Sequence, residues 1–465
     1  MARIIDEVVT IRVSDLTAAA ASTSVNTAAV VGVTTKDNVQ TQVLYSQDAV
    51  KEAYETGTKR IIYLEPSLTT ASSGEVELKL GTVKVASAKV KAGSNGTNVR
   101  SMIKALASSF KVDGYSAVAS ATRLTISSDA YGATESEDGT FSIDYNDTGF
   151  SGSLVNADGE EGADIVNVTK SFFEEEANPG KIVCIPVGAY PTAGNIADTL
   201  YDALALGRDS NNRDIDFYHV IVRLGESATA NDVSTLASAL ESWCRTNDKQ
   251  AYIEVQDRTV AEDAWAAIST NPPDYVSIFF HKEASKKCCV AALVANRCAN
   301  DPARGTWDLK NLPSIEPDAT GVDNYKDAYE LGVNIYAPIA SVGCVASGTT
   351  GSKTKFIDTQ VKKRWLKFRS QEAIFDVLRK ANGGDGADFD DSGIQDVVTA
   401  MTDIFKLAED NEHRYIMKGS WEITAPLYKD IPAADKDVRN LPRVRAVCTI
   451  MNSIHTVKTV EIQVV

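Results

Sequence analysis

The chain has 465 residues; 47 are Lys or Arg and 63 are Asp or Glu, so its formal net charge is 47 − 63 = −16. A chain this acidic lacks the basic footprint of a general nucleic-acid or anionic-membrane binder. Hydrophobic residues make up 43% and charged residues 24%, which is ordinary for globular domains and excludes wholesale disorder. The length predicts about two to four domains.

The sequence also indicates the compartment of the protein and the redox state of its cysteines. No apolar run approaches the ~18 residues of a membrane-spanning helix, and the N-terminal residues lack the apolar core of a signal peptide. The seven cysteines are scattered through apolar contexts, which predicts reduced, buried thiols rather than a disulfide framework. We therefore expect a protein that is made in a cytoplasm and does not insert into membranes.

The first predicted element is a β-strand close to the N-terminus. Val9, Ile11 and Val13 alternate along it, and no neighbouring segment offers a partner strand. An Ala/Ser/Thr-rich stretch follows at 17–27. The strand is therefore expected to be an arm on a flexible tether.

A β-α-β pattern then begins with a strand at 28–33, a helix at 46–57 and a strand at 61–66. Strands alternate with helices again over 181–299. This alternation predicts a mostly parallel sheet covered by helices on both faces.

The composition changes between 67 and 162, where Gly, Ser, Thr, Ala and Val dominate. Alternating residues at 75–93 predict strands, and apolar residues at helical spacing predict a helix at 98–110. We interpret 67–162 as a small β-rich α+β module inserted into the α/β domain.

The C-terminal third begins after a Pro/Gly-rich segment at 311–321, which we interpret as a domain boundary. A helix is predicted at 355–380, and a second helix begins at Ser392, where Ser392 and Gln395 match a capping box. The last residues predict a strand, because Val460, Ile462 and Val464 alternate with polar residues. Chain ends fray unless something pairs with them, so this strand needs a partner.

The predicted fold is thus a multidomain α/β and α+β chain. An inner polymerisation domain combines 1–20 with 315–465 and carries both terminal arms. A mostly parallel α/β domain combines 21–66 with 163–314. The inserted module at 67–162 is the third part.

Two blocks of opposite charge lie side by side in the C-terminal third. Residues 351–380 contain nine cations and three anions (9 − 3 = +6), and residues 381–412 contain one cation and nine anions (1 − 9 = −8). They are either two solvated helix faces or complementary contacts between copies of the chain. For the second alternative, the candidate basic contact is Lys362, Lys363, Arg364, Lys367 and Arg369, and the acidic counterpart is Asp385, Asp388, Asp390 and Asp391.

Motifs for catalysis or ligand binding fail on inspection. The segment 348–354 (GTTGSKT) imitates a phosphate-binding loop, but Ser352 separates Gly351 from Lys353. The acidic run at 388–393 imitates the start of a calcium loop, but its twelfth position is Thr399 rather than glutamate. No catalytic, cofactor or metal site is predicted, and we do not expect an enzyme.

The two terminal strands favour assembly. Unpaired strand edges template pairing with other chains, and soluble monomers normally suppress them. A strand at each end is explained if neighbouring copies supply the partners by strand addition. A head-to-tail contact that does not close produces a helical polymer.

The chain at this point resembles a known family. The stretch GTTGSKTKFIDTQVKKRWLKFRSQEAIFDVLRKANGG, followed by DFDDSGIQDVVTAMTDIF and the closing RVRAVCTIMNSIHTVKTVEIQVV, resembles the polymerising domain of contractile phage tail sheath proteins. The segments KAGSNGTNVRSMIKALASSF and RLTISSDAYGATES are similar to an insert found in one branch of that family. The resemblance rests on pattern and order rather than on one short motif.

The resemblance implies subunits in six-fold rings stacked around an inner tail tube, with a baseplate and a tail terminator as further partners and no cofactor. Arms at 1–16 and 454–465 would add strands to sheets of adjacent subunits. Contraction would drive the tube through the bacterial envelope, and the protein would belong to a virion tail assembled in the host cytoplasm. The basic helix would meet an acidic surface of a neighbour or the tube, with 325–465 inside and 67–162 outside.

Two other classes remain open. The α/β sheet could hold the site of an enzyme or a solute-binding protein at the ends of its strands. The chain could also form a surface or shell that assembles without contracting.

Overall fold

The computed structural model describes residues 24–455 except 56, 58, 94–95, 132, 159–162, 319–329, 331 and 385. The chain divides into two compact units. Glu55–Ala163 forms one of them, and the residues up to Tyr54 together with those from Asp164 onward form the other. Within the described ranges, no helix combines the length and the apolar character that a membrane crossing requires.

An eight-stranded sheet organises the larger unit, in the order β17-β16-β15-β14-β13-β1-β12-β2. The strands are β1 (Ala28–Val33), β2 (Gln42–Leu44), β12 (Ile182–Val187), β13 (His219–Arg223), β14 (Gln250–Val255), β15 (Val276–Phe280), β16 (Asn334–Ile339) and β17 (Val342–Ala346). The six central strands are parallel, and β2 and β17 pair antiparallel at the two edges. The predicted mostly parallel sheet is confirmed.

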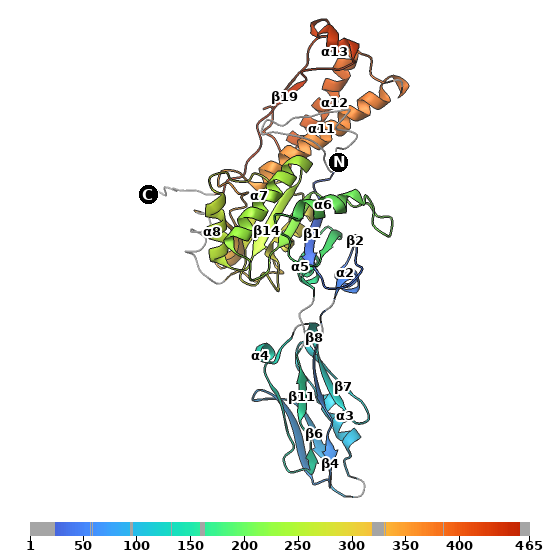
Figure 1. Cartoon of the computed structure of the whole chain (residues 1–465), viewed down its shortest axis with the longest axis vertical. Helices are drawn as coiled ribbons and strands as arrows, with labels where there is room; N and C mark the ends of the chain where they lie inside the picture. The colour runs from blue at the N-terminus through green and yellow to red at the C-terminus, as the bar shows by residue number, and fades with distance from the viewer. Residues whose placement is uncertain are drawn as a thin grey trace, which may run out of the picture. The chain divides into compact units, whose positions relative to one another are not determined.

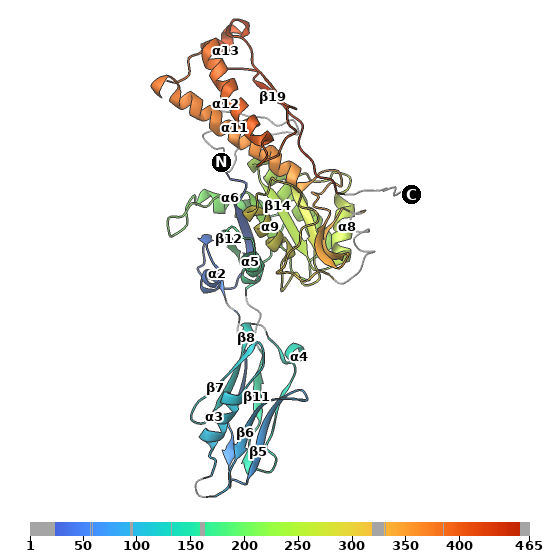
Figure 2. The same ribbon diagram turned by 180° about the vertical axis from the view of Figure 1, so that it is seen from behind.

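Helices cover both faces of this sheet because its strands are apolar on both sides; all five residues of β13 are buried. The helices are α2 (Gln47–Tyr54), α5 (Asp164–Glu174), α6 (Ile196–Ala205), α7 (Ala230–Asn247), α8 (Arg258–Ile268) and α9 (Cys289–Ala299). Residues of α6, α7 and α8 share one core cluster with one face of the strands. On the other side, α9 contacts α5, β1, β13 and β14. Figure 1 shows the sheet from the side of α7, and Figure 2 shows it from the side of α9.

The cysteines agree with the predicted reduced state. All seven are free thiols, five of them buried and two, Cys344 and Cys448, partly buried. They are part of the packing rather than a disulfide framework.

The predicted boundary at 311–321 is wrong in one respect. The strand β16 pairs in parallel with β15, with Phe279 opposite Asn334, so 334–346 completes the α/β sheet. The α/β part and the C-terminal part also belong to the same compact unit. The Pro/Gly-rich segment is therefore a connection inside this unit.

The smaller unit has its own core between two sheets and a helix. One sheet has the order β11-β3-β8-β7 and the other β6-β5-β9, with a separate β10-β4 pair. The elements are β3 (Lys59–Leu64), β4 (Ser67–Leu68), β5 (Gly74–Leu80), β6 (Val83–Val90), α3 (Val99–Ser109), β7 (Tyr115–Ala119), β8 (Leu124–Tyr131), α4 (Glu135–Asp138), β9 (Phe141–Asp144), β10 (Phe150–Ser151) and β11 (Leu154–Ala157). Asn98 and Ser101 form a capping box at the N-terminus of α3.

The inserted module was predicted to begin at 67, and this start is too late. The strand at 61–66 was assigned to the α/β domain, but β3 pairs antiparallel with β8 and β11. The sequence of an apolar strand indicates that the strand is buried. It does not indicate which sheet the strand joins. The pairing moves the start of the module to Glu55.

The C-terminal part of the larger unit adds a helical hairpin and a small sheet (Figure 1). Its elements are α11 (Ile357–Gly384), α12 (Asp391–Glu409), β18 (Glu422–Thr424), the 3₁₀ helix η1 (Tyr428–Asp430), α13 (Ala433–Asp437) and β19 (Arg445–Val447). The helices α11 and α12 lie side by side in both views (Figure 2).

Candidate subunit interface

The long helix α11 changes its surroundings half-way along. Its first part is buried, with Ile357 and Val361 fully inaccessible and Gln371 only 1% exposed. From Glu372 to Lys380 every residue is partly or fully exposed. The helix therefore begins in the packed body of the unit and continues along the hairpin, which explains why its sequence lacks one consistent apolar face.

Three of the predicted basic contact residues lie inside the chain. Arg364 and Lys367 both bind the carboxylate of Asp248, and Lys367 Nζ lies 2.5 Å from Asp248 Oδ2. Asp248 is fully buried in the left-handed conformation (φ 55°) directly after α7. The guanidinium of Arg364 also lies over the ring of Tyr275, 4.6 Å from its centroid.

Lys362 is the third. Its ammonium donates to Asp358 at 2.6 Å and to the carbonyl of Met451 at 2.8 Å, and its side chain is only 1% exposed. The expectation that Lys362, Arg364 and Lys367 contact another copy is therefore wrong. Their charges are offset by carboxylates of the same chain, as burial requires.

The other two basic residues, Lys363 and Arg369, are partly exposed. Arg369 lies 2.5 Å from Glu372, one turn along the helix. Both stay candidates for a contact with another molecule.

The acidic residues cluster at the start of α12. Asp390 is the N-cap, and its Oδ1 accepts from the amides of Ser392 and Gly393, both at 2.9 Å. Asp391 accepts from the amide of Tyr428 at 2.7 Å. Asp388 is exposed, and Asp385 lies outside the described residues.

The start of α12 corrects the predicted capping box. The cap is Asp390 rather than Ser392, and the helix begins at Asp391. A Cβ on Gly393 would lie 1.9 Å from the carbonyl oxygen of Asp388, so glycine is required for this close approach. Over the described ranges, no group of three His, Cys, Asp or Glu side chains is placed to hold a metal ion.

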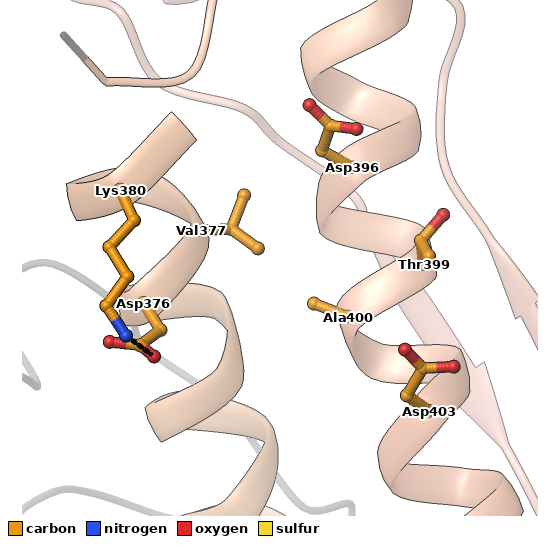
Figure 3. Close-up of a pocket in the computed structure, with 7 residues that line it drawn as sticks. All are labelled: Asp376, Val377, Lys380, Asp396, Thr399, Ala400 and Asp403. Carbon is orange, nitrogen blue, oxygen red and sulfur yellow. Dashed lines mark hydrogen bonds and ion pairs between the residues drawn. The ribbon is translucent and has the colours of Figure 1, made fainter. Parts of the chain in front are cut away.

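A groove runs between the exposed parts of α11 and α12 (Figure 3). It has a volume of about 450 Å³ and is lined by Asp376, Val377, Lys380, Asp396, Thr399, Ala400 and Asp403. Lys380 Nζ lies 2.5 Å from Asp376, whereas Asp396 and Asp403 lie on α12. A second pocket of about 450 Å³ shares Asp376 and reaches Arg369, Phe375 and Ile404. The exposed part of the hairpin thus offers a hollowed, acidic surface.

The sheet of β18 and β19 has only two strands, with Ile423 opposite Ala446. Across the described ranges, no third strand pairs with either of them. Such a pair is marginal in water, and its edges are templates for further strands. Large apolar side chains are exposed nearby in the chain, with Met417 and Val447 each 46% exposed.

The predicted arm residues Val9, Ile11, Val13, Val460, Ile462 and Val464 lie outside the described residues. The described residues nearest to these two arms in the sequence are held by contacts within the larger unit. Val25 is buried, and its carbonyl lies 2.9 Å from His219 Nε2. At the other end, Met451 donates its amide to Tyr415 at 2.9 Å. Both chain ends therefore leave from fixed points of the larger unit.

An α/β enzyme would bind its ligand at the ends of the parallel strands, and the polar side chains at the ends of β1, β13 and β14 make internal contacts there. At the end of β1, Asp164 accepts from the amide of Val33 at 3.4 Å and binds Arg223, which donates to Tyr190 Oη at 2.6 Å. At the end of β14, the buried Glu254 accepts from the amides of Cys289 and Val290 at the start of α9, at 2.9 and 3.0 Å. Burial raises the pKa of Glu254, and its contacts with His281, Cys288 and α9 oppose this effect.

Comparison with known proteins gives distant similarities to solved structures, two of which are described here. No family model matches the chain, and no curated protein matches it. The chain is similar to a protein of the six-fold symmetrised anti-feeding prophage baseplate, with a TM-score of 0.43 and 9% identity over 64% of this chain and 79% of that one. It is also similar to the sheath tail protein of Desulfitobacterium hafniense, with a TM-score of 0.39 and 8% identity over 93% and 98% of the two chains.

Proposed function

We propose that the chain is a structural subunit of a tail sheath, which polymerises around an inner tube and contracts to drive that tube through a bacterial envelope. The observation that carries the proposal is the two-stranded β18–β19 sheet with open edges. It belongs to the unit from which both chain ends, each with a predicted β-strand, depart.

The predicted strands at 1–16 and 454–465 suit an exchange between copies. Strands added from neighbours would complete the small sheet and give each terminal strand its hydrogen bonds.

The sheath resemblance supplies the rest of the proposal. The copies would form stacked six-fold rings, with an inner tube, a baseplate and a terminator as partners, in a virion tail assembled in the host cytoplasm. The exposed part of the hairpin, with its acidic groove, is the surface we assign to a contact with another component. No nucleic acid or membrane is needed as a partner.

An enzymatic role is the weaker candidate. The polar side chains at the ends of β1 and β14 bind one another and the start of α9 rather than converge on open space. Each of them thus has a structural explanation.

Negative-stain microscopy of the purified chain tests the proposal. We expect long striated hollow cylinders from the full chain and dispersed particles from a chain that ends at His455. Circular dichroism and thermal unfolding of the shortened chain should match those of the full chain. Dispersed monomers from the full chain at all salt concentrations would contradict the proposal, and cylinders of one fixed length would favour a shell that does not contract.

A further inference from the structure

His455, the last described residue of the C-terminal segment, packs against the loop at 306–308. His455 Nε2 lies 2.8 Å from Thr306 Oγ1, and the edge of its ring faces Phe356 with the centroids 4.7 Å apart. Only 9% of the His455 side chain is exposed. The preceding residue, Ile454, is 82% exposed, so the chain turns the imidazole inward and the isoleucine outward.

A buried carboxylate faces the same imidazole. Asp308 is fully buried, and its Oδ1 accepts from the amides of Leu309 and Ser347, each at 2.9 Å. Its Oδ2 lies 3.5 Å from His455 Nδ1. Neither of these two atoms has a hydrogen-bond partner at that separation. The two groups are thus placed for an ion pair that forms only when the imidazole carries both protons.

Other charged and titratable groups surround the pair. They are Lys310 on the same loop, Arg297 on α9, and Asp358 and Lys362 on α11; the thiol of Cys344 on β17 also faces Asp308. Asp308 Oδ2 is the carboxylate oxygen that faces His455 Nδ1. Burial raises the pKa of Asp308, and the imidazole and the backbone amides act against this rise.

The loop that holds His455 also touches the other chain end. Trp307 is fully buried, and its ring lies 5.4 Å from that of His219, the residue whose Nε2 faces the carbonyl of Val25. The root of the N-terminal segment and the root of the C-terminal segment therefore meet at consecutive residues of one loop.

We propose that His455 is a charge-dependent anchor of the C-terminal segment, held more firmly when its imidazole is protonated. The protonated ring donates from Nε2 to Thr306 Oγ1 and from Nδ1 to Asp308 Oδ2. The neutral ring keeps the contact with Thr306 and loses the ion pair. The anchor is therefore weaker when the ring is neutral. Under the proposed function, it sets the direction in which the C-terminal arm leaves for a neighbouring copy.

A spin label at Ile454→Cys in the full chain measures the anchor directly, because this side chain is exposed and adjacent to His455. We expect the label to become several-fold more mobile between pH 5.5 and pH 8.5. His455→Gln keeps a donor for Thr306 but does not titrate, and Asp308→Asn keeps the Oδ1 acceptor but removes the charge. Each should abolish the pH dependence.

His413→Gln is the matched control, since His413 faces a carboxylate of its own, Asp410, at 3.0 Å. It should leave the pH dependence intact. Equal mobility at both pH values in the parent chain, or unchanged pH dependence in His455→Gln, would overturn the proposal. The label is read on non-sedimenting chains, so a failure to polymerise contradicts the proposed function without affecting this test.

Discussion

Arg364 and Asp248 lie 116 positions apart in the sequence and form a buried ion pair that fastens α11 to the end of α7. Lys367 shares the same carboxylate, so one buried anion is matched by two cations. These three charged side chains connect α11 to the α/β part of the unit. We therefore expect the position of the hairpin to depend on them.

Replacing Asp248 by Asn should destabilise the larger unit by about 3–5 kcal/mol, because it removes the buried carboxylate that binds the two buried cations Arg364 and Lys367. Urea unfolding followed by tryptophan fluorescence measures the effect. The matched control is Asp376→Asn, whose partners Arg379 and Lys380 are exposed, and for which we expect no measurable change. Equal urea midpoints for the two variants would contradict this account.

The sequence predicted some parts of the fold well and others poorly, for physical reasons. The strand at 28–33 and the alternation of strands and helices over 181–299 are recognised because parallel strands buried on both faces are continuous apolar runs. The sheet that β3 joins is not encoded in β3 itself, and the module boundary was misplaced for that reason. Pairing in a sheet depends on segments distant in the chain.

The basic run on α11 shows the same limit for the candidate interface. Counting charges in 351–380 predicted an exposed cationic surface, but the partner of Arg364 and Lys367 is more than a hundred residues away. One signal was available: both residues border Val361, Trp365 and Phe368, the apolar positions that bury this part of the helix. A cation among such positions needs an internal partner.

Lys362→Met should destabilise the chain, by up to about 3–5 kcal/mol, because Asp358 stays buried without its counter-ion. Lys363→Met is the control on the same helix, and we expect nearly parental stability because its side chain is partly exposed. Thermal unfolding of the two variants gives the comparison. A charge reversal that includes Lys362 and Arg364 would therefore disturb folding as well as assembly, and only Lys363 and Arg369 test an intermolecular contact. A folded, fully stable Lys362→Met protein would refute this reasoning.

The edge strand β2 should weaken in acid because of Asp209. Burial by itself would raise the pKa of this carboxyl, but the amides of Arg213, Val43 and Asn211 outweigh it and hold the pKa below its ordinary value. A lowered pKa contributes stability above the unfolded value of about 3.9, and this stability is lost as the pH falls through the folded value. Asp209→Asn should therefore have a lower urea midpoint than the parent at pH 7, and the difference should shrink from pH 4 to pH 2.5. A difference that stays constant over that range would contradict the assignment.

The acidic groove should matter for assembly and not for folding. Asp396 and Asp403 are on exposed turns of α12, so replacing both by Asn should leave thermal unfolding unchanged. If the groove contacts another component, cylinder length in negative stain should fall, and its dependence on salt should weaken. The control is the double change Asp198→Asn and Asp202→Asn on α6, which lies outside the hairpin. Shortened cylinders from the control as well would mean that net charge, rather than this surface, governs assembly.

The strand-addition step can be tested at one exposed position of the small sheet. Val447 on β19 is 46% exposed, and Lys at a sheet edge opposes the approach of another strand. Val447→Lys should therefore keep the unfolding temperature of the parent and lose long cylinders. Val118→Lys is the matched control, because Val118 is 66% exposed on β7, an edge strand of the other unit. The proposal assigns strand addition to β18–β19 alone, so the two variants must differ. Long cylinders from Val447→Lys would show that the small sheet is not the assembly contact. Loss of long cylinders in both variants would contradict the assignment as well.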